Sequence, residues 1–105
     1  MTVDIRIYSG FAGQAGRLSA VRHELDPLLR TVPGLRRFQL LETAEGLVIV
    51  TEAESRTACD ECVRRADGWM SERMPSLAGY RPLSVTGEVI VEAGEVAAHL
   101  PLRLR

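Results

Sequence analysis

The sequence predicts an α+β, ferredoxin-like fold, with elements in the order β-α-β-β-α-β around one antiparallel four-stranded sheet. Three observations lead to this expectation. Segments with period-two alternation lie near both ends of the first 92 residues, two apolar stripes at helical spacing separate the strands, and Pro33-Gly34 interrupts the chain just before two consecutive strands. This order predicts a fold and the place of a pocket, and it leaves the reaction open.

The first strand and the first helix follow from the change of period. Val3, Ile5 and Ile7 share one face of a predicted strand, and Asp4, Arg6 and Tyr8 share the other. Apolar residues then recur at helical spacing from about Gln14 to Thr31. Pro27 predicts a kink in this helix, or its restart as a short final turn after Asp26. Pro33-Gly34 ends it.

The second and third strands are expected over residues 35–42 and 46–52, joined by a short hairpin connection at 43–46. Within the third strand, Leu47-Val48-Ile49-Val50 is apolar on both faces, which is typical of a central strand covered on each side. Two helices can cover only one face of a four-stranded sheet. The other face therefore needs a partner, and we expect a homodimer.

The second helix is expected to begin at a cap formed by Ser55 or Thr57 and to end at Pro75. Its apolar stripe comprises Ala58, Cys59, Cys62, Val63, Ala66, Trp69 and Met70. Residues 76–82 form a loop, with room for one short helical turn. The fourth strand is predicted over residues 84–92. Residues 1–92 thus form one domain, and the tail 93–105 is an edge strand or a dimer arm.

The composition excludes several classes of function. The chain has 105 residues, a net charge of -1, 13 basic and 14 acidic residues, and 5% aromatic residues. Nucleic acid and anionic membranes need a concentrated basic face, so neither is an expected partner. The sequence contains no Lys, which excludes a lysine Schiff base. With no leader-like or long apolar segment, a cytoplasmic protein is expected.

The pair Cys59 and Cys62 forms a C-x-x-C spacing near the start of the second helix. A helix N-terminus lowers a thiol pKa, so a redox switch is one interpretation. Both cysteines also fall on the apolar stripe, where thiols pack as small hydrophobic groups. The sequence offers no second cysteine pair for zinc, and the structural interpretation is favoured.

These elements resemble the dimeric α+β barrel superfamily, in particular small antibiotic-biosynthesis-monooxygenase-like proteins. The resemblance rests on Pro33-Gly34-Leu35, on the strand Gly46-Leu47-Val48-Ile49-Val50 and on a helix from Ser55 to Trp69 that ends in an aromatic residue. It covers about residues 3–91. It implies a homodimer whose sheets pack face to face, with a ligand site in each subunit between the sheet and the helices.

The resemblance also implies two chemistries. Related proteins include cofactor-independent oxygenases acting on polycyclic phenols, and haem-degrading oxygenases have a similar fold. Both patterns commonly use an Asn one helical turn before a Trp. Here Arg65 stands one turn before Trp69, and the chain has no Asn. The haem-degrading pattern also needs a His on that helix, and none lies between Ser55 and Met74.

The sequence is compatible with two functions. In the first, the protein is an enzyme with no metal and no bound cofactor that acts on an aromatic or polyketide-type molecule. Trp69 and Phe38 then shape the pocket, Tyr8 or an arginine orients a phenol or carbonyl oxygen, and Arg37 and Arg81 are the arginine candidates. In the second, the protein is a non-catalytic ligand-binding or assembly dimer, in which Trp69 is a core residue and Asp4, Arg6 and Tyr8 fix the dimer.

Overall fold

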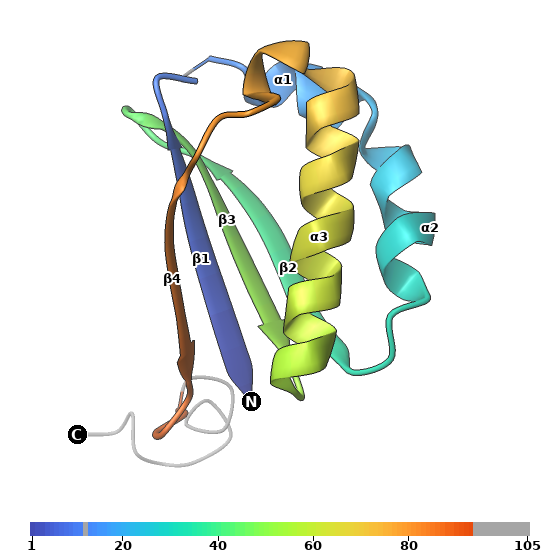
Figure 1. Ribbon diagram of the computed structural model, residues 1–105, viewed down its shortest axis with the longest axis vertical. Helices are drawn as coiled ribbons and strands as arrows, with labels where there is room; N and C mark the ends of the chain where they lie inside the picture. Colours follow the sequence, from blue (N-terminus) through green and yellow to red (C-terminus); the bar gives the residue numbers. More distant parts are fainter. Residues whose placement is uncertain (12, 94–105) are drawn as a thin grey trace, which may run out of the picture.

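The computed structural model describes residues 1–11 and 13–93. Four strands form one antiparallel sheet in the order β2-β3-β1-β4, with β1 at Thr2–Ser9, β2 at Leu35–Glu42, β3 at Gly46–Ala53 and β4 at Leu83–Glu88. Helices α3 (Arg56–Arg73) and α2 (Leu25–Arg30) lie side by side on one side of the sheet (Figure 1). The predicted α+β ferredoxin-like fold is confirmed.

The first helical segment is not the continuous helix predicted over residues 14–31. It consists of α1 (Ala15–Ala20), the 3₁₀ turn η1 (Arg22–Glu24) and α2. The predicted position of the break, after Asp26, is therefore wrong. Pro27 has no N–H to donate to the carbonyl of His23, so an α-helix through both residues would lose that hydrogen bond and be kinked or broken. The interruption lies one turn before the proline, and Pro27 itself stands in the first turn of α2.

The hairpin between β2 and β3 forms where it was predicted. The backbone N–H of Thr43 donates to the carbonyl of Gly46 at 2.8 Å, and Gly46 donates back at 3.3 Å. A Cβ atom at Gly46 would lie 2.1 Å from the carbonyl oxygen of Tyr8, so the close approach of β1 requires a glycine here.

The last strand is shorter than the predicted span of 84–92. β4 ends at Glu88, which is paired with Thr2, the first residue of β1. Val89 adds one backbone hydrogen bond to the carbonyl of Met1 at 2.9 Å. Residues 90–92 have no neighbouring strand residue to pair with in the described part of the chain, and Ile90 and Val91 are exposed. The expectation of an edge strand or dimer arm falls on residues beyond 93, outside the described residues.

The helices cover the polar face of β1 and leave its apolar face open, which the sequence did not predict. Thr2, Asp4 and Tyr8, on the polar face of β1, lie buried beneath the helices, whereas the apolar Val3, Ile5 and Ile7 face away from them. The strand pairings extend this open face with Leu41, Val48, Val50, Leu83 and Val85. Ile5, Leu83 and Val85 are 37%, 67% and 62% exposed. The face left without helices is therefore mainly apolar, with the ion pair of Arg37 and Glu52 toward one end.

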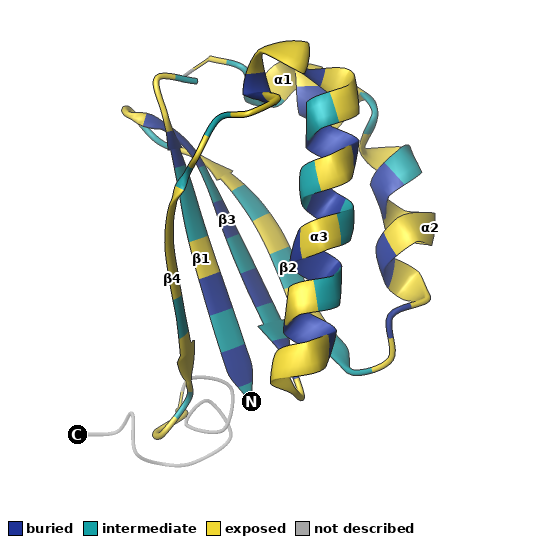
Figure 2. Ribbon diagram, viewed as in Figure 1, coloured by how far each residue is buried: buried dark blue, intermediate teal, exposed yellow. Residues whose placement is uncertain are grey.

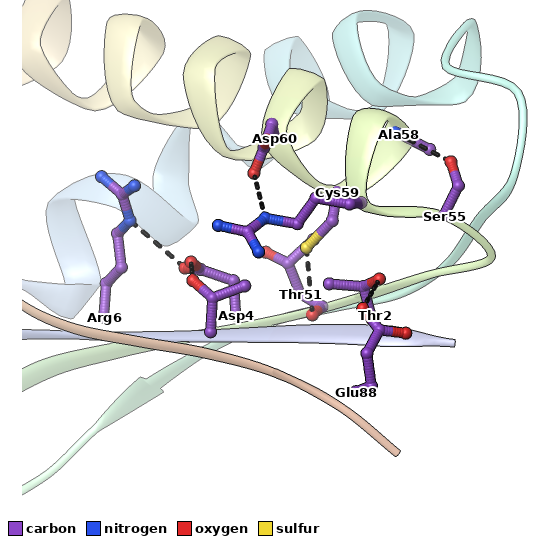
Figure 3. Close-up of polar contacts among 11 residues, drawn as sticks. Thr2, Asp4, Arg6, Thr51, Ser55, Ala58, Cys59, Asp60 and Glu88 are labelled. Carbon is purple, nitrogen blue, oxygen red and sulfur yellow. Dashed lines mark hydrogen bonds and ion pairs between the residues drawn. The ribbon is translucent and has the colours of Figure 1, made fainter. Parts of the chain in front are cut away.

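Helix α3 supplies most of the helical side of the core. Its buried residues are Ala58, Cys59, Cys62, Val63, Ala66, Trp69 and Met70, which matches the predicted stripe and appears as the dark turns facing the sheet in Figure 2. The backbone N–H of Ala58 donates to Ser55 Oγ at 3.1 Å, so Ser55 and not Thr57 is the N-cap (Figure 3). Across the described ranges, no helix is long and apolar enough to cross a bilayer.

Both cysteines belong to this core. Cys59 and Cys62 are each 0% exposed, and neither forms a disulfide. Burial raises the pKa of the Cys59 thiol to about 11, with the Asp4 carboxylate adding to the effect. Burial also raises the pKa of Cys62. Thiols in this state are protonated and unreactive at neutral pH, which supports the structural interpretation.

Replacing the cap by Ser55→Ala should lower the free energy of unfolding by about 1 kcal/mol, because the N–H of Ala58 loses its acceptor. The matched control is Thr57→Ala, which removes the rival hydroxyl and should change stability by less than about 0.5 kcal/mol. Urea denaturation followed by circular dichroism measures both. Equal losses in the two variants would contradict the assignment of Ser55 as the cap.

The cysteines should not react with a thiol reagent at pH 8 in the native state, and both should react once the protein is unfolded in guanidinium chloride. Burial keeps the two sulfur atoms away from the reagent and keeps them protonated. Counting reacted thiols by absorbance, with and without prior reduction, checks this. Rapid reaction in the native state, or thiols that appear only after reduction, would support the redox interpretation instead.

Candidate functional site

A cleft lies between α1, η1, α2 and strand β2, with Trp69 of α3 in its wall, and we call it the Trp69 cleft. Its volume is about 500 Å³. The lining residues are Ala15, Leu18, Ser19, Arg22, Leu25, Phe38, Leu40, Glu42 and Trp69. Small-molecule sites have volumes of roughly 300–1,000 Å³ and are lined mainly by apolar groups with a few polar ones. The Trp69 cleft has this size and this character.

The floor of the cleft is one face of β2. Phe38, Leu40 and Glu42 are separated by two residues each, so their side chains leave the strand on the same side. The opposite wall comes from the interrupted first helix. Leu18 lies on α1 and Leu25 begins α2, with η1 between them. The interruption one turn before Pro27 therefore divides this wall into three short segments, α1, η1 and α2, which together lie opposite β2.

Trp69 is held in place as a wall of this cleft. Its ring is 6% exposed, and its indole Nε1–H donates to Glu24 Oε1 at 3.2 Å. The same carboxylate accepts from Arg73 Nη2 at 2.8 Å. Glu24 thus connects η1 to two residues of α3 that lie one helical turn apart. The indole N–H is already used within the protein, so Trp69 offers a ligand its apolar ring surface.

Arg65, one turn before Trp69, has a structural role in this arrangement. It donates to Glu61 Oε2, to the carbonyl of Leu28 and to Thr31 Oγ1, each at 2.7 Å. Hydrogen bonds from Arg64 and Arg65 lower the pKa of Glu61 to about 2, so this carboxylate is ionised. The guanidinium of Arg65 thereby ties the end of α2 to α3 and keeps the wall of the cleft fixed. Arg65 lines neither this cleft nor its neighbour described below.

Tyr8 lies elsewhere, on the helix-facing side of β1. Its hydroxyl donates to Asp67 Oδ1 at 3.2 Å, and its ring stacks on Tyr80 with the ring centres 6.0 Å apart. Burial, followed by the charge of Asp67, raises the pKa of Tyr8 to about 12. The phenol is therefore neutral at physiological pH and bound within the protein. Tyr8 is not among the residues that line the Trp69 cleft.

A polar cluster continues along the same face of β1 beneath α3 (Figure 3). Asp4 is buried, and its carboxylate accepts from Arg6 Nε at 3.2 Å and from Thr86 Oγ1 at 2.6 Å. Thr2 Oγ1 donates to Glu88 at 2.6 Å. These bonds join β1 to β4 and satisfy the buried carboxylate. The polar face considered for the dimer interface thus lies inside the protomer.

The two candidate arginines also lie away from the cleft. Arg37 neighbours Phe38 on β2 and so points to the opposite, open face, where its Nη1 lies 3.4 Å from Glu52 Oε1. Arg81 is exposed just before β4 and does not line the Trp69 cleft. Of the sequence candidates, the cleft brings together Trp69 and Phe38.

Three polar residues of the cleft were missed by sequence reasoning: Ser19, Arg22 and Glu42. Glu42 could have been found, because it continues the period of Phe38 and Leu40 on β2. Arg22 could not, because its position depends on the break in the first helix. In the described part of the chain, no group of three or more His, Cys, Asp or Glu side chains is arranged to hold a metal ion.

No protein-family model matches the chain, and no curated protein matches it. Several solved structures are similar. A heme-degrading protein from Mycobacterium tuberculosis has a TM-score of 0.57 and 22% sequence identity, over 89% of this chain and 98% of that one. A monooxygenase from Streptomyces coelicolor, in complex with the ligand nanaomycin D, has a TM-score of 0.53 and 16% identity, over 88% and 91% of the two chains. An antibiotic biosynthesis monooxygenase has a TM-score of 0.53 and 15% identity, over 86% and 98%. The expected resemblance is confirmed at the level of the fold: the chain has the ferredoxin-like α+β fold of antibiotic-biosynthesis-monooxygenase-like structures.

Proposed function

We propose that this protein is a small, homodimeric, monooxygenase-like protein that binds an aromatic or polyketide-type molecule in the Trp69 cleft. The observation that carries the proposal is a cleft of about 500 Å³ that Trp69 and Phe38 both line. Apolar side chains supply most of the surface of the cleft. Moving a flat apolar molecule from water into the cleft is therefore favourable. The similar structures include monooxygenases, one of them in complex with nanaomycin D.

The polar groups of the cleft suit an oxygenated ligand. Arg22 can donate to a phenolate or carbonyl oxygen, Ser19 can donate or accept, and Glu42 can accept from a hydroxyl. A few polar groups in an apolar cleft orient a ligand without dominating its binding. These residues take the orienting role first considered for Tyr8, Arg37 and Arg81, which lie outside the cleft.

The proposed reaction needs no bound cofactor, because the substrate supplies the electrons. A ring CH₂ of a reduced polycyclic phenol becomes a carbonyl group, one atom of O₂ enters that carbonyl, and the other leaves as water together with the two hydrogens. Glu42 is the candidate to accept the first C–H proton, and Arg22 the candidate to stabilise the enolate that forms. Both roles are assigned because Glu42 and Arg22 line the cleft in which the substrate would bind.

The residues of the described part of the chain do not fit haem degradation. Haem iron needs an axial ligand, commonly a His. Helix α3 has no His, and the described His23 is exposed and lines neither the Trp69 cleft nor its neighbour.

A second candidate function is that of a non-catalytic ligand-binding dimer. It is favoured by the contacts of Arg65 and Trp69, which are both engaged within the protein. Arg65 occupies the position one turn before the Trp where the related oxygenases commonly have an Asn, and its guanidinium fixes α2 instead of contacting the cleft. Such a dimer would bind the same class of ligand without consuming O₂.

The homodimer is supported by the open face of the sheet. The apolar side chains there are Val3, Ile5, Ile7, Leu41, Val48, Val50, Leu83 and Val85. A contiguous apolar surface of this kind marks a site of association. A two-fold axis brings the same surface of two copies together, so one apolar sheet face can cover another.

The ligand site is tested with 1,8-dihydroxyanthrone, whose central CH₂ is the reactive group. Trp69 is the only tryptophan, so quenching of its fluorescence reports binding. The Phe38→Ala variant should bind about tenfold more weakly because it loses apolar contact with the ring. The control Gln39→Ala, which changes the neighbouring residue on the open face, should bind as the unchanged protein does.

O₂ uptake, measured with an oxygen electrode, and the absorbance of the anthraquinone product distinguish the two candidate functions. Binding with O₂ uptake above the uncatalysed rate supports the enzyme, and binding without uptake supports the non-catalytic dimer. No quenching by the anthrone, or equal affinity in the Phe38→Ala variant, would overturn the assignment of the Trp69 cleft.

The dimer is tested by Val85→Glu, which places a charge on the open face without disturbing the core of the protomer. Burying that charge against a second copy is unfavourable, so the variant should be a monomer at micromolar concentration. The matched control is Ser84→Glu, the exposed neighbour on the other face of β4, which should remain a dimer. Light scattering measures both masses. A monomeric mass for the unchanged protein would contradict the proposal.

A further inference from the structure

A second cleft continues the Trp69 cleft along β2, and we call it the Leu29 cleft. Its volume is about 310 Å³, and it is lined by Leu29 of α2 and Leu35 of β2, with the ion pair of Asp26 and Arg30 at its edge. The two clefts share Arg22, Leu25 and Phe38. They are therefore neighbouring lobes of one groove that meet at Phe38.

The order of residues along β2 gives the direction of this groove. Leu35 lines only the Leu29 cleft, Phe38 lines both clefts, and Glu42 lines only the Trp69 cleft. An extended strand rises about 3.3 Å per residue, so the groove follows β2 for about 20 Å. That length suits an elongated molecule better than a compact one.

The charge at the junction of the lobes is positive and is not neutralised by a carboxylate. Arg22 Nη1 donates to Ser19 Oγ at 3.1 Å and to the carbonyl of Ser19 at 3.4 Å, both neutral acceptors. Among the residues described, Arg22 forms no ion pair, whereas Arg30, the other arginine of the groove, pairs with Asp26. A free guanidinium between two apolar lobes is complementary to an acidic group on an apolar ligand.

A carboxylate that forms no ion pair among the described residues lies at one end of the groove, whereas the carboxylate of Asp26, in the Leu29 cleft, is paired with Arg30. Glu42, in the Trp69 cleft, accepts from the backbone N–H of Gly13 at 2.8 Å. A second acidic group of the ligand would be repelled at this end, while a hydroxyl could donate to the carboxylate. The two charges together specify where on the ligand an acidic group is accepted and where it is not.

We propose that the groove binds an elongated, largely apolar molecule with a single acidic group, a carboxylate or a phenolate, paired with Arg22 and with apolar portions in both lobes. This inference rests on the proposed function and names the class of ligand for that site. The aromatic portion lies against Trp69, and the second portion extends past Phe38 toward Leu29 and Leu35.

The test compares three fluorescent probes that share one aromatic group: 1-pyrenebutanoic acid (the short acid), 1-pyrenebutanol and 2-hexyl-4-(1-pyrenyl)butanoic acid (the long acid). In the long acid the carboxylate lies between the aromatic group and an alkyl chain, as the proposed binding mode requires. Energy transfer from Trp69 to pyrene reports occupancy of the Trp69 cleft. The short acid should bind about tenfold more tightly than the alcohol, the size of one charge-assisted hydrogen bond. The long acid should bind at least tenfold more tightly than the short acid, because its chain enters the Leu29 cleft.

Two variants locate these effects. Arg22→Gln should remove the preference for acid over alcohol, while the control Arg17→Gln, an exposed arginine of α1 that lines neither lobe, should keep it. Leu35→Trp should fill the Leu29 cleft and remove the advantage of the long acid without weakening the short one. The probe series on the unchanged protein measures the same advantage if Leu35→Trp does not fold.

The outcomes separate this inference from the proposed function. Equal affinity of the acid and the alcohol, or an acid preference that survives Arg22→Gln, overturns the role of Arg22 while the cleft remains a ligand site. Equal affinity of the long and short acids overturns the use of both lobes. Binding of none of the probes overturns the proposed function as well, and is the result expected if a second copy of the chain covers the groove.

Discussion

The missing N–H of Pro27 is the constraint on which the site depends. It disfavours a regular α-helix through His23, and the chain instead forms α1, the turn η1 and α2. That turn carries both Arg22, which lines the groove along β2, and Glu24, which accepts from the indole of Trp69. A continuous helix would leave neither side chain in its present relation to β2 and α3. A single proline thus defines the wall of the cleft.

The two faces of the sheet differ in polarity. The face beneath the helices carries buried polar groups, of which Asp4 is satisfied by Arg6 and Thr86, and the open face is mainly apolar. In the proposed dimer a second copy covers the apolar face, whereas the cleft lies on the helical side, so the proposed association and the proposed ligand binding use separate surfaces. On the same side of the sheet, Arg65 of α3 donates to the carbonyl of Leu28 and to Thr31 Oγ1 and so fixes α2 to α3.

The order of elements, the stripe of α3 and the hairpin at Gly46 could be predicted, because each depends on local period or on local turn chemistry. Phe38 and Trp69, the two pocket residues expected from the layers of the fold, both line the same cleft, and their role as a ligand site stays a prediction. Arg22 was missed because its place depends on where a proline-interrupted helix restarts, which is set by packing of Leu25 and by the contact of Glu24 with α3. Tyr8 was a reasonable candidate, but the sequence alone did not say which face of β1 the helices would cover.

The central claim is that an aromatic ligand binds on the helical side of the sheet, in the cleft that Trp69 and Phe38 line, and not on the open apolar face. Nuclear magnetic resonance of ¹⁵N-labelled protein tests it most directly, because the single tryptophan gives one indole N–H signal. Adding 1-pyrenebutanoic acid should shift that signal and the amide signals of η1, while the amide of Val85 stays in place. A shift of Val85 with an unchanged indole signal would place the ligand on the open face and contradict the account.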